Sequence, residues 1–227
     1  MQVWMRCVVV VVTSFIAGCA TGHPPRAVYQ DPSTVISIQS DTKAGQGHSH
    51  PAAVSPEAIR YVLDGMRVQS RSSFIPSIMT GGASYGMAFS KDEQAVLAPY
   101  LSQALAVARP DELVTFYRRV STSAVGLAIT SGGVFVHGQH LYIVLANSRT
   151  LPSEGMSQSI VSEIDPVDSP LLPISRRAFR AAFIPATSMV PEDERWGWSY
   201  IDPGRLVVID LIQLGRDMRS LALRDAP

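Results

Sequence analysis

The chain has 227 residues, of which 46% are hydrophobic and 17% are charged. This composition provides enough apolar material for one packed domain and argues against intrinsic disorder. The 19 basic and 19 acidic residues give a formal net charge of zero. Because no excess of positive charge would attract a polyanion, no nucleic-acid partner is expected.

The first 18 residues have the three parts of a bacterial export signal. Arg6 supplies the positive charge, residues 7–16 form a short apolar run, and small residues follow. A helix that crosses a bilayer needs about 20 apolar residues, so this run is too short for a permanent membrane span. We therefore expect residues 1–18 to be removed from the mature chain.

The signal ends in Ile16-Ala17-Gly18-Cys19, which resembles the lipobox of bacterial lipoproteins. The resemblance implies a diacylglyceryl group on the sulfur of Cys19, cleavage before Cys19 and acylation of the new amino terminus. Several acyl chains would hold the protein at a membrane stably without spanning it. Ala20 stands where an aspartate commonly retains lipoproteins in the inner membrane, so the resemblance implies the outer membrane, facing the periplasm. The alternative is an ordinary cleaved signal with an incidental cysteine.

Residues 19–54 contain several prolines and many Ser, Thr, Gln and Gly residues. This composition is typical of a flexible linker, because it offers too little apolar surface to pack. We predict a lipidated amino terminus followed by a flexible tether. Residues 34–39 are an exception, because their alternation of apolar and polar side chains favours a strand that docks on the body.

Two helices are predicted in the first part of the body. Ser55-Pro56 favours a helix start, because Ser can cap a helix and Pro fits its first position. An apolar stripe at helical spacing extends this helix to about Gln69. Ser90-Lys91-Asp92-Glu93 fits a capping box and predicts a second helix. Pro99 predicts a kink or a break within it, and Arg109-Pro110 predicts its end.

Beyond residue 111 the apolar period changes to that of strands. The first four strands are expected at residues 113–120, 124–129, 133–137 and 140–147. Turns at Ser131-Gly132 and at His137-Gly138-Gln139 would connect them as an antiparallel meander. The fourth is nearly all apolar, which indicates a central strand covered on both faces. Later strands are expected at residues 159–164, 178–183 and 206–210, and an apolar stripe over residues 211–222 predicts a final helix.

Helices that precede and follow a run of strands indicate the α+β class. We predict a single domain over residues 55–227, with an antiparallel sheet of about five to seven strands backed by two or three helices. Cys7 and Cys19 are the only cysteines in the chain. The folded body therefore contains no disulfide and depends on packing.

Gly82-Ala83-Ser84-Tyr85-Gly86 matches the G-x-S-x-G pattern, which in hydrolases holds a nucleophilic serine on a sharp strand-to-helix turn. Asp111 and then His137 or His140 follow in the order serine, acid, histidine. No buried strand precedes this serine and no helix begins at it, so a glycine-rich surface loop is the favoured interpretation. An envelope serine hydrolase that uses Ser84 is the alternative function.

Gly47-His48-Ser49-His50 places two imidazoles where both could reach one Cu or Zn ion. Asp41 and His23 are the nearest further ligands, and a mobile tether would give the site little support. A polar linker without a metal is the favoured interpretation, and no cofactor is expected. His137 and His140 flank a tight turn, and we expect that their side chains need not share a face.

Trp196, Trp198 and Tyr200 follow a cluster of carboxylates in a predicted loop. Exposed aromatic side chains favour an interface, although the two tryptophans could instead cover the sheet as part of the core. Residues 72–89 form a second predicted loop. The sequence as a whole predicts a non-catalytic, lipid-anchored binding or scaffold protein that contacts another envelope protein through one of these loops.

Overall fold

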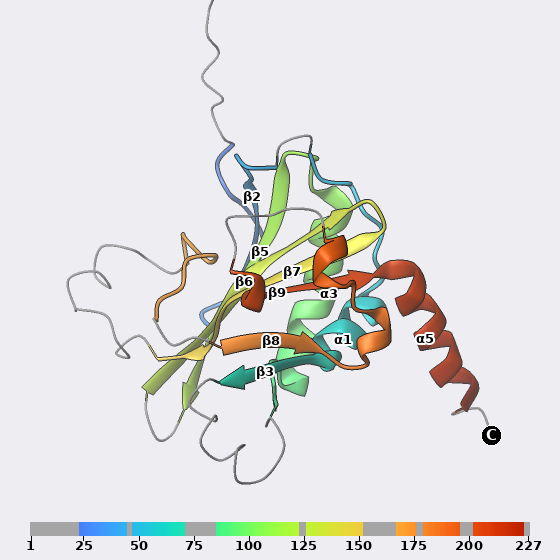
Figure 1. The fold of residues 1–227 in the computed structure, drawn as a ribbon. Helices are drawn as coiled ribbons and strands as arrows, with labels where there is room; N and C mark the ends of the chain where they lie inside the picture. Colours follow the sequence, from blue (N-terminus) through green and yellow to red (C-terminus); the bar gives the residue numbers. More distant parts are fainter. Residues whose placement is uncertain are drawn as a thin grey trace, which may run out of the picture.

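The protein is described by a computed structural model over residues 23–44, 47–70, 85–122, 126–151, 167–175, 179–195 and 202–224. These residues form a six-stranded sheet, a three-stranded sheet and three α-helices (Figure 1). All of the strand pairs are antiparallel. The predicted α+β class, with a sheet of about five to seven strands backed by two or three helices, is confirmed.

The larger sheet has the strand order β1-β2-β5-β6-β7-β9. Its strands are β1 (Arg26–Gln30), β2 (Thr34–Ser40), β5 (Glu112–Thr122), β6 (Gly126–His137), β7 (His140–Thr150) and β9 (Leu206–Asp210). Residues 141–147 of β7 are all buried, and β7 lies between β6 and β9. The prediction of a central strand covered on both faces is therefore confirmed.

The smaller sheet has the order β4-β3-β8, with β4 at Gly86–Met87, β3 at Met66–Ser70 and β8 at Phe179–Phe183. The strand expected at residues 178–183 is thus confirmed. The strand expected at residues 159–164 lies outside the described residues.

Helix α1 (Pro56–Gly65) begins as predicted, with the Ser55 hydroxyl oxygen accepting a hydrogen bond from the amide of Ala58. It ends four residues before Gln69, so the predicted length is wrong. The chain instead continues as β3, which pairs with β8. A Cβ atom at Gly65 would lie 2.2 Å from the Phe183 ring, so the helix ends where its backbone packs directly against β8.

Helix α3 (Lys91–Val107) has the predicted capping box. The Glu93 amide donates to Ser90 Oγ at 3.2 Å, and the Ser90 amide donates to Glu93 Oε2 at 2.6 Å. The helix continues through Pro99 without a break. The predicted final helix is also confirmed, as α5 (Leu211–Arg224). Of the helices in the described residues, none has both the length and the apolar character needed to cross a bilayer.

Alternate residues of the large sheet point to two separate apolar layers, as the pleat of a strand requires. One layer packs against α1 and α3 and contains, from the sheet, Ile36, Ile38, Val114, Phe116, Val134, Leu141, Ile143, Val207 and Ile209. The other layer is covered by residues 167–175 and by the segment around Val190, and contains Leu113, Phe135, Tyr142, Val144, Leu206 and Val208. The sheet is therefore covered on both faces.

The prediction of a flexible tether up to residue 54 is wrong for its described part, because β1 and β2 belong to the large sheet. The strand expected at residues 34–39 is confirmed. Asp31 closes the turn between β1 and β2, since its Oδ1 accepts from the amides of Ser33 and Thr34 at 2.6 and 2.7 Å. Hydrogen bonds from the Tyr29 hydroxyl and from Ser33 and Thr34 lower the pKa of Asp31 to about 2.

The predicted turn at Ser131-Gly132 is also wrong, because β6 runs through these residues with irregular pairing to β7. A Cβ atom at Gly132 would lie 1.9 Å from the carbonyl oxygen of Val144 and 2.8 Å from the Phe116 ring. This glycine allows a close approach within the sheet and does not form a turn. The turn predicted at His137-Gly138-Gln139 is confirmed, with Gly138 at a φ of 59°.

Candidate functional site

His48 and His50 lie in a loop that packs against one end of the large sheet. The His48 amide donates to the Pro110 carbonyl at 2.6 Å, and the Ser49 amide donates to the Val136 carbonyl at 2.7 Å. The two histidines are only 4% and 6% exposed. They therefore belong to the folded domain and not to a polar linker.

Each of these histidines uses its Nε2 atom within the chain. His48 Nε2 lies 2.9 Å from Asp41 Oδ2, and His50 Nε2 accepts from the Val136 amide at 3.0 Å. The ring centroids of the two histidines are 5.5 Å apart. In the described part of the chain, no group of three or more His, Cys, Asp or Glu side chains is arranged to hold a metal ion. The arrangement supports a structural role, in which the histidines fix the loop to the sheet.

His50 is held in its neutral form. Burial is the main cause that lowers its pKa from 6.5 to about 4, and the neighbouring His48 is the second cause. Backbone carbonyls of Glu112 and Arg109 act in the opposite direction. Because Nε2 accepts the hydrogen bond from Val136, we assign the proton of the neutral ring to Nδ1.

The residues of the hydrolase alternative are only partly described. Ser84 lies outside the described residues, so the serine turn is untested. Asp111 is exposed in the turn before β5. His137 and His140 are paired directly across the β6–β7 hairpin, so their side chains share a face, a point that the sequence left open.

Most residues of the two predicted contact loops also lie outside the described residues, including Trp196, Trp198 and Tyr200. The end of the 72–89 loop is described. There Ala88 and Phe89 are fully buried and belong to the core. Cys19 lies outside the described residues as well.

A groove of about 460 Å³ lies between α1, the start of α3 and α5. It is lined by the apolar side chains of Tyr61, Ala95, Met218 and Leu221, by the polar side chain of Gln94 and by a charged rim of Glu57, Arg60, Asp64 and Lys91. The volume lies within the range of known ligand pockets.

The charged rim of the groove is held in place by Asp64. Its Oδ1 accepts from Lys91 Nζ at 2.6 Å and from Gln94 Nε2 at 3.1 Å. The hydrogen bond from Lys91 is the main cause that lowers the pKa of Asp64, so this side chain is ionised at neutral pH. Asp64 thereby links the end of α1 to the start of α3 on one side of the groove.

Helix α5 forms the other wall and leaves much of its apolar surface uncovered. Only Leu214 is fully buried, whereas Ile212, Leu221 and Leu223 are 45%, 40% and 78% exposed. Figure 1 shows α5 at the edge of the molecule, with its C-terminal half projecting from the body. Of these three, Leu221 lines the groove, and an exposed apolar side chain in a groove with a polar rim is typical of an interaction surface.

No family model, no curated protein and no solved structure matches this chain. The groove is a functional candidate that sequence reasoning did not identify. The signal for it was the stripe of Leu211, Leu214, Met218 and Leu221, but periodicity does not tell whether the protein's own core covers the whole stripe.

Proposed function

We propose that this chain is a lipid-anchored protein of a bacterial cell envelope that binds another envelope protein. The observation that carries the binding role is the groove between α1, α3 and α5. The anchoring role is supported by Ile16-Ala17-Gly18-Cys19 and its resemblance to a lipobox. Ala20 after this cysteine favours the outer membrane, with the domain facing the periplasm.

The chemistry of the groove favours a protein segment as the ligand. Specific protein interfaces have an apolar centre and a polar rim. Here Tyr61, Met218 and Leu221 supply the apolar centre, and side chains of both charge signs surround it. The mixed rim offers no excess of positive charge for a polyanion. An apolar side chain flanked by charged residues of the partner would match both parts of the groove.

Site-specific crosslinking in cells tests this proposal. A photoreactive residue in place of Leu221 should give a covalent adduct with one envelope protein, because Leu221 lines the groove. The matched control is the same residue in place of Leu223, which lies on the same helix, is 78% exposed and does not line the groove. This control should give little of that adduct.

A charged substitution in the groove supplies the second measurement. With the photoreactive residue in place of Met218, Leu221→Glu should remove most of the adduct, because it buries a carboxylate in the apolar centre of the interface. Leu223→Glu should leave the adduct unchanged. Equal adduct yields at Leu221 and Leu223, or an adduct that survives Leu221→Glu, would contradict binding at the groove.

A further inference from the structure

We infer that the lipid on Cys19 holds one particular end of the domain against the headgroup surface of the bilayer. This inference rests on the proposed lipid anchor and goes beyond it by specifying how the domain is oriented. The surface in question comprises His23, Thr42, Lys43, Ser49 and residues 109–111. We term this surface the anchor-proximal end.

Only a short length of chain lies between the lipid and the folded domain, and this supports a fixed orientation of the domain. The His23 amide donates to Ser40 Oγ at 2.8 Å, and Ser40 Oγ donates to the His23 carbonyl at 3.4 Å. His23 therefore belongs to the folded domain, and only residues 20–22, here termed the stem, separate it from Cys19. An extended chain spans at most about 3.6 Å per residue, so the Cα atoms of Cys19 and His23 are at most about 14 Å apart.

This distance is less than the size of the domain. A compact chain of about 200 residues has a radius of gyration of about 16 Å, so its diameter is several times the reach of the stem. A long tether would let the domain turn freely and rise from the membrane. The short stem permits neither, because the end of the domain that carries His23 must stay near the lipid headgroups.

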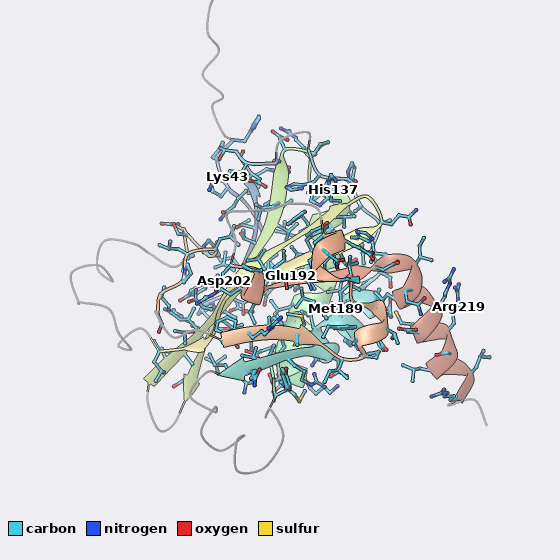
Figure 2. The ribbon with its side chains drawn as sticks, in the orientation of Figure 1. Lys43, His137, Met189, Glu192, Asp202 and Arg219 are labelled. Carbon is cyan, nitrogen blue, oxygen red and sulfur yellow. The ribbon has the colours of Figure 1, made fainter. Side chains whose placement is uncertain are left out.

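Hydrogen bonds join the other segments to this same end. The Asp41 amide donates to the Asp111 carbonyl at 2.8 Å, and the His48 amide donates to the Pro110 carbonyl. The Gly138 amide donates to Ser49 Oγ at 2.8 Å. Figure 2 shows Lys43 and His137 at one end of the molecule and Arg219 of α5 well away from them.

The chemistry of the anchor-proximal end fits headgroups and not acyl chains. Its exposed side chains include Thr42, Lys43, Ser49, Arg109 and Asp111. None of the large apolar side chains exposed in the described residues belongs to it. Hydroxyl, ammonium and guanidinium groups can donate hydrogen bonds to the phosphate and ester oxygens of lipid headgroups. The surface should therefore rest at headgroup level without inserting into the bilayer.

The orientation has a consequence for the groove. Because α5 lies away from the anchor-proximal end, the groove is held off the bilayer and open to the aqueous side. A partner in the periplasm could then reach the groove without competing with lipid.

Distance-dependent fluorescence quenching on the full lipidated protein tests the inference. Cys7 lies in the excised signal and Cys19 carries the lipid, so one introduced cysteine would be the only reactive thiol. A fluorophore on Lys43→Cys should be quenched several-fold more strongly by nitroxide-labelled headgroups in phosphatidylethanolamine–phosphatidylglycerol vesicles than the same fluorophore on Arg219→Cys. A flexible Gly-Ser insertion of about 20 residues between Gly22 and His23 should remove most of this difference, because it lengthens the stem.

The possible results distinguish a failure of the proposed orientation from a failure of the proposed lipid anchor. Equal quenching at the two positions, or stronger quenching at Arg219→Cys, in protein that is lipidated and sediments with the vesicles would overturn the orientation while leaving the anchor intact. Protein that carries no lipid on Cys19 and stays in solution would instead overturn the proposed anchor, and this inference with it.

Discussion

At the scale of single residues, His50 links the stability of the domain to pH. Its neutral ring is buried and accepts a hydrogen bond from the Val136 amide, and the centroid of the His48 ring lies 5.5 Å from its own. The pKa of His50 falls from 6.5 in the unfolded chain to about 4 in the folded domain. Between these two values the unfolded state binds more protons, so the free energy of unfolding decreases as the pH falls.

We therefore expect the free energy of unfolding, measured with urea, to fall by about 2 kcal/mol from pH 8 to pH 5 on account of His50 alone. His50→Gln is the matched variant, because the glutamine Oε1 can accept from the Val136 amide and does not titrate. The variant should lack this part of the pH dependence. Identical pH profiles for the two proteins would show that His50 is not the group responsible.

The roles of some single residues could not be predicted from the sequence, because they depend on contacts with distant parts of the chain. The composition around His48 and His50 favours a polar linker, but their burial depends on contacts with Pro110 and Val136, which are distant in the sequence. Gly132 was interpreted as a turn residue, yet it permits close contact with Val144 and Phe116. A glycine in a turn and a glycine under a neighbouring strand look alike in a single sequence.

At the scale of elements, alanine substitutions at one glycine of α1 and one glycine of α5 should change the free energy of unfolding in opposite directions. At Gly65 of α1 a Cβ atom would lie 2.2 Å from the Phe183 ring and 2.6 Å from the Ile184 carbonyl oxygen. Gly65→Ala should therefore lower the free energy of unfolding by about 2 kcal/mol or more, since packed β8 must move. At Gly215 of α5 nothing lies within 4 Å of such an atom.

Gly215→Ala should consequently raise the free energy of unfolding by about 0.5 to 1 kcal/mol, because alanine loses less backbone entropy in a helix. Urea titrations of both variants at one pH measure the two effects side by side. A Gly65→Ala protein as stable as the parent would mean that α1 does not end by packing on β8.

Local signals predicted the elements whose ends are fixed locally. The start of α1, the capping box of α3 and the β6–β7 turn are all confirmed. Elements whose extent depends on distant partners were less predictable. Residues 26–40 resemble a linker in composition, but β2 pairs along its whole length with β5, and the hydrogen bonds of Asp31 turn the chain back for β1.

At the scale of the whole molecule, the period change after residue 111 and the helices on either side correctly indicated an α+β domain. The groove could not be predicted in this way. It arises because α1, α3 and α5, which are far apart in the sequence, meet at one side of the molecule. Which apolar side chains stay uncovered is decided by that packing and not by the pattern within α5.

We propose above all that the mature protein begins at Cys19 and is held at the membrane by lipid on that residue. Intact-mass spectrometry of protein extracted from its native membrane tests it most directly. We expect a native chain that starts at Cys19 and carries the added mass of a diacylglyceryl group and an amino-terminal acyl chain, and a Cys19→Ser chain that carries neither group. A native chain with an unmodified sulfur at Cys19 would contradict the account.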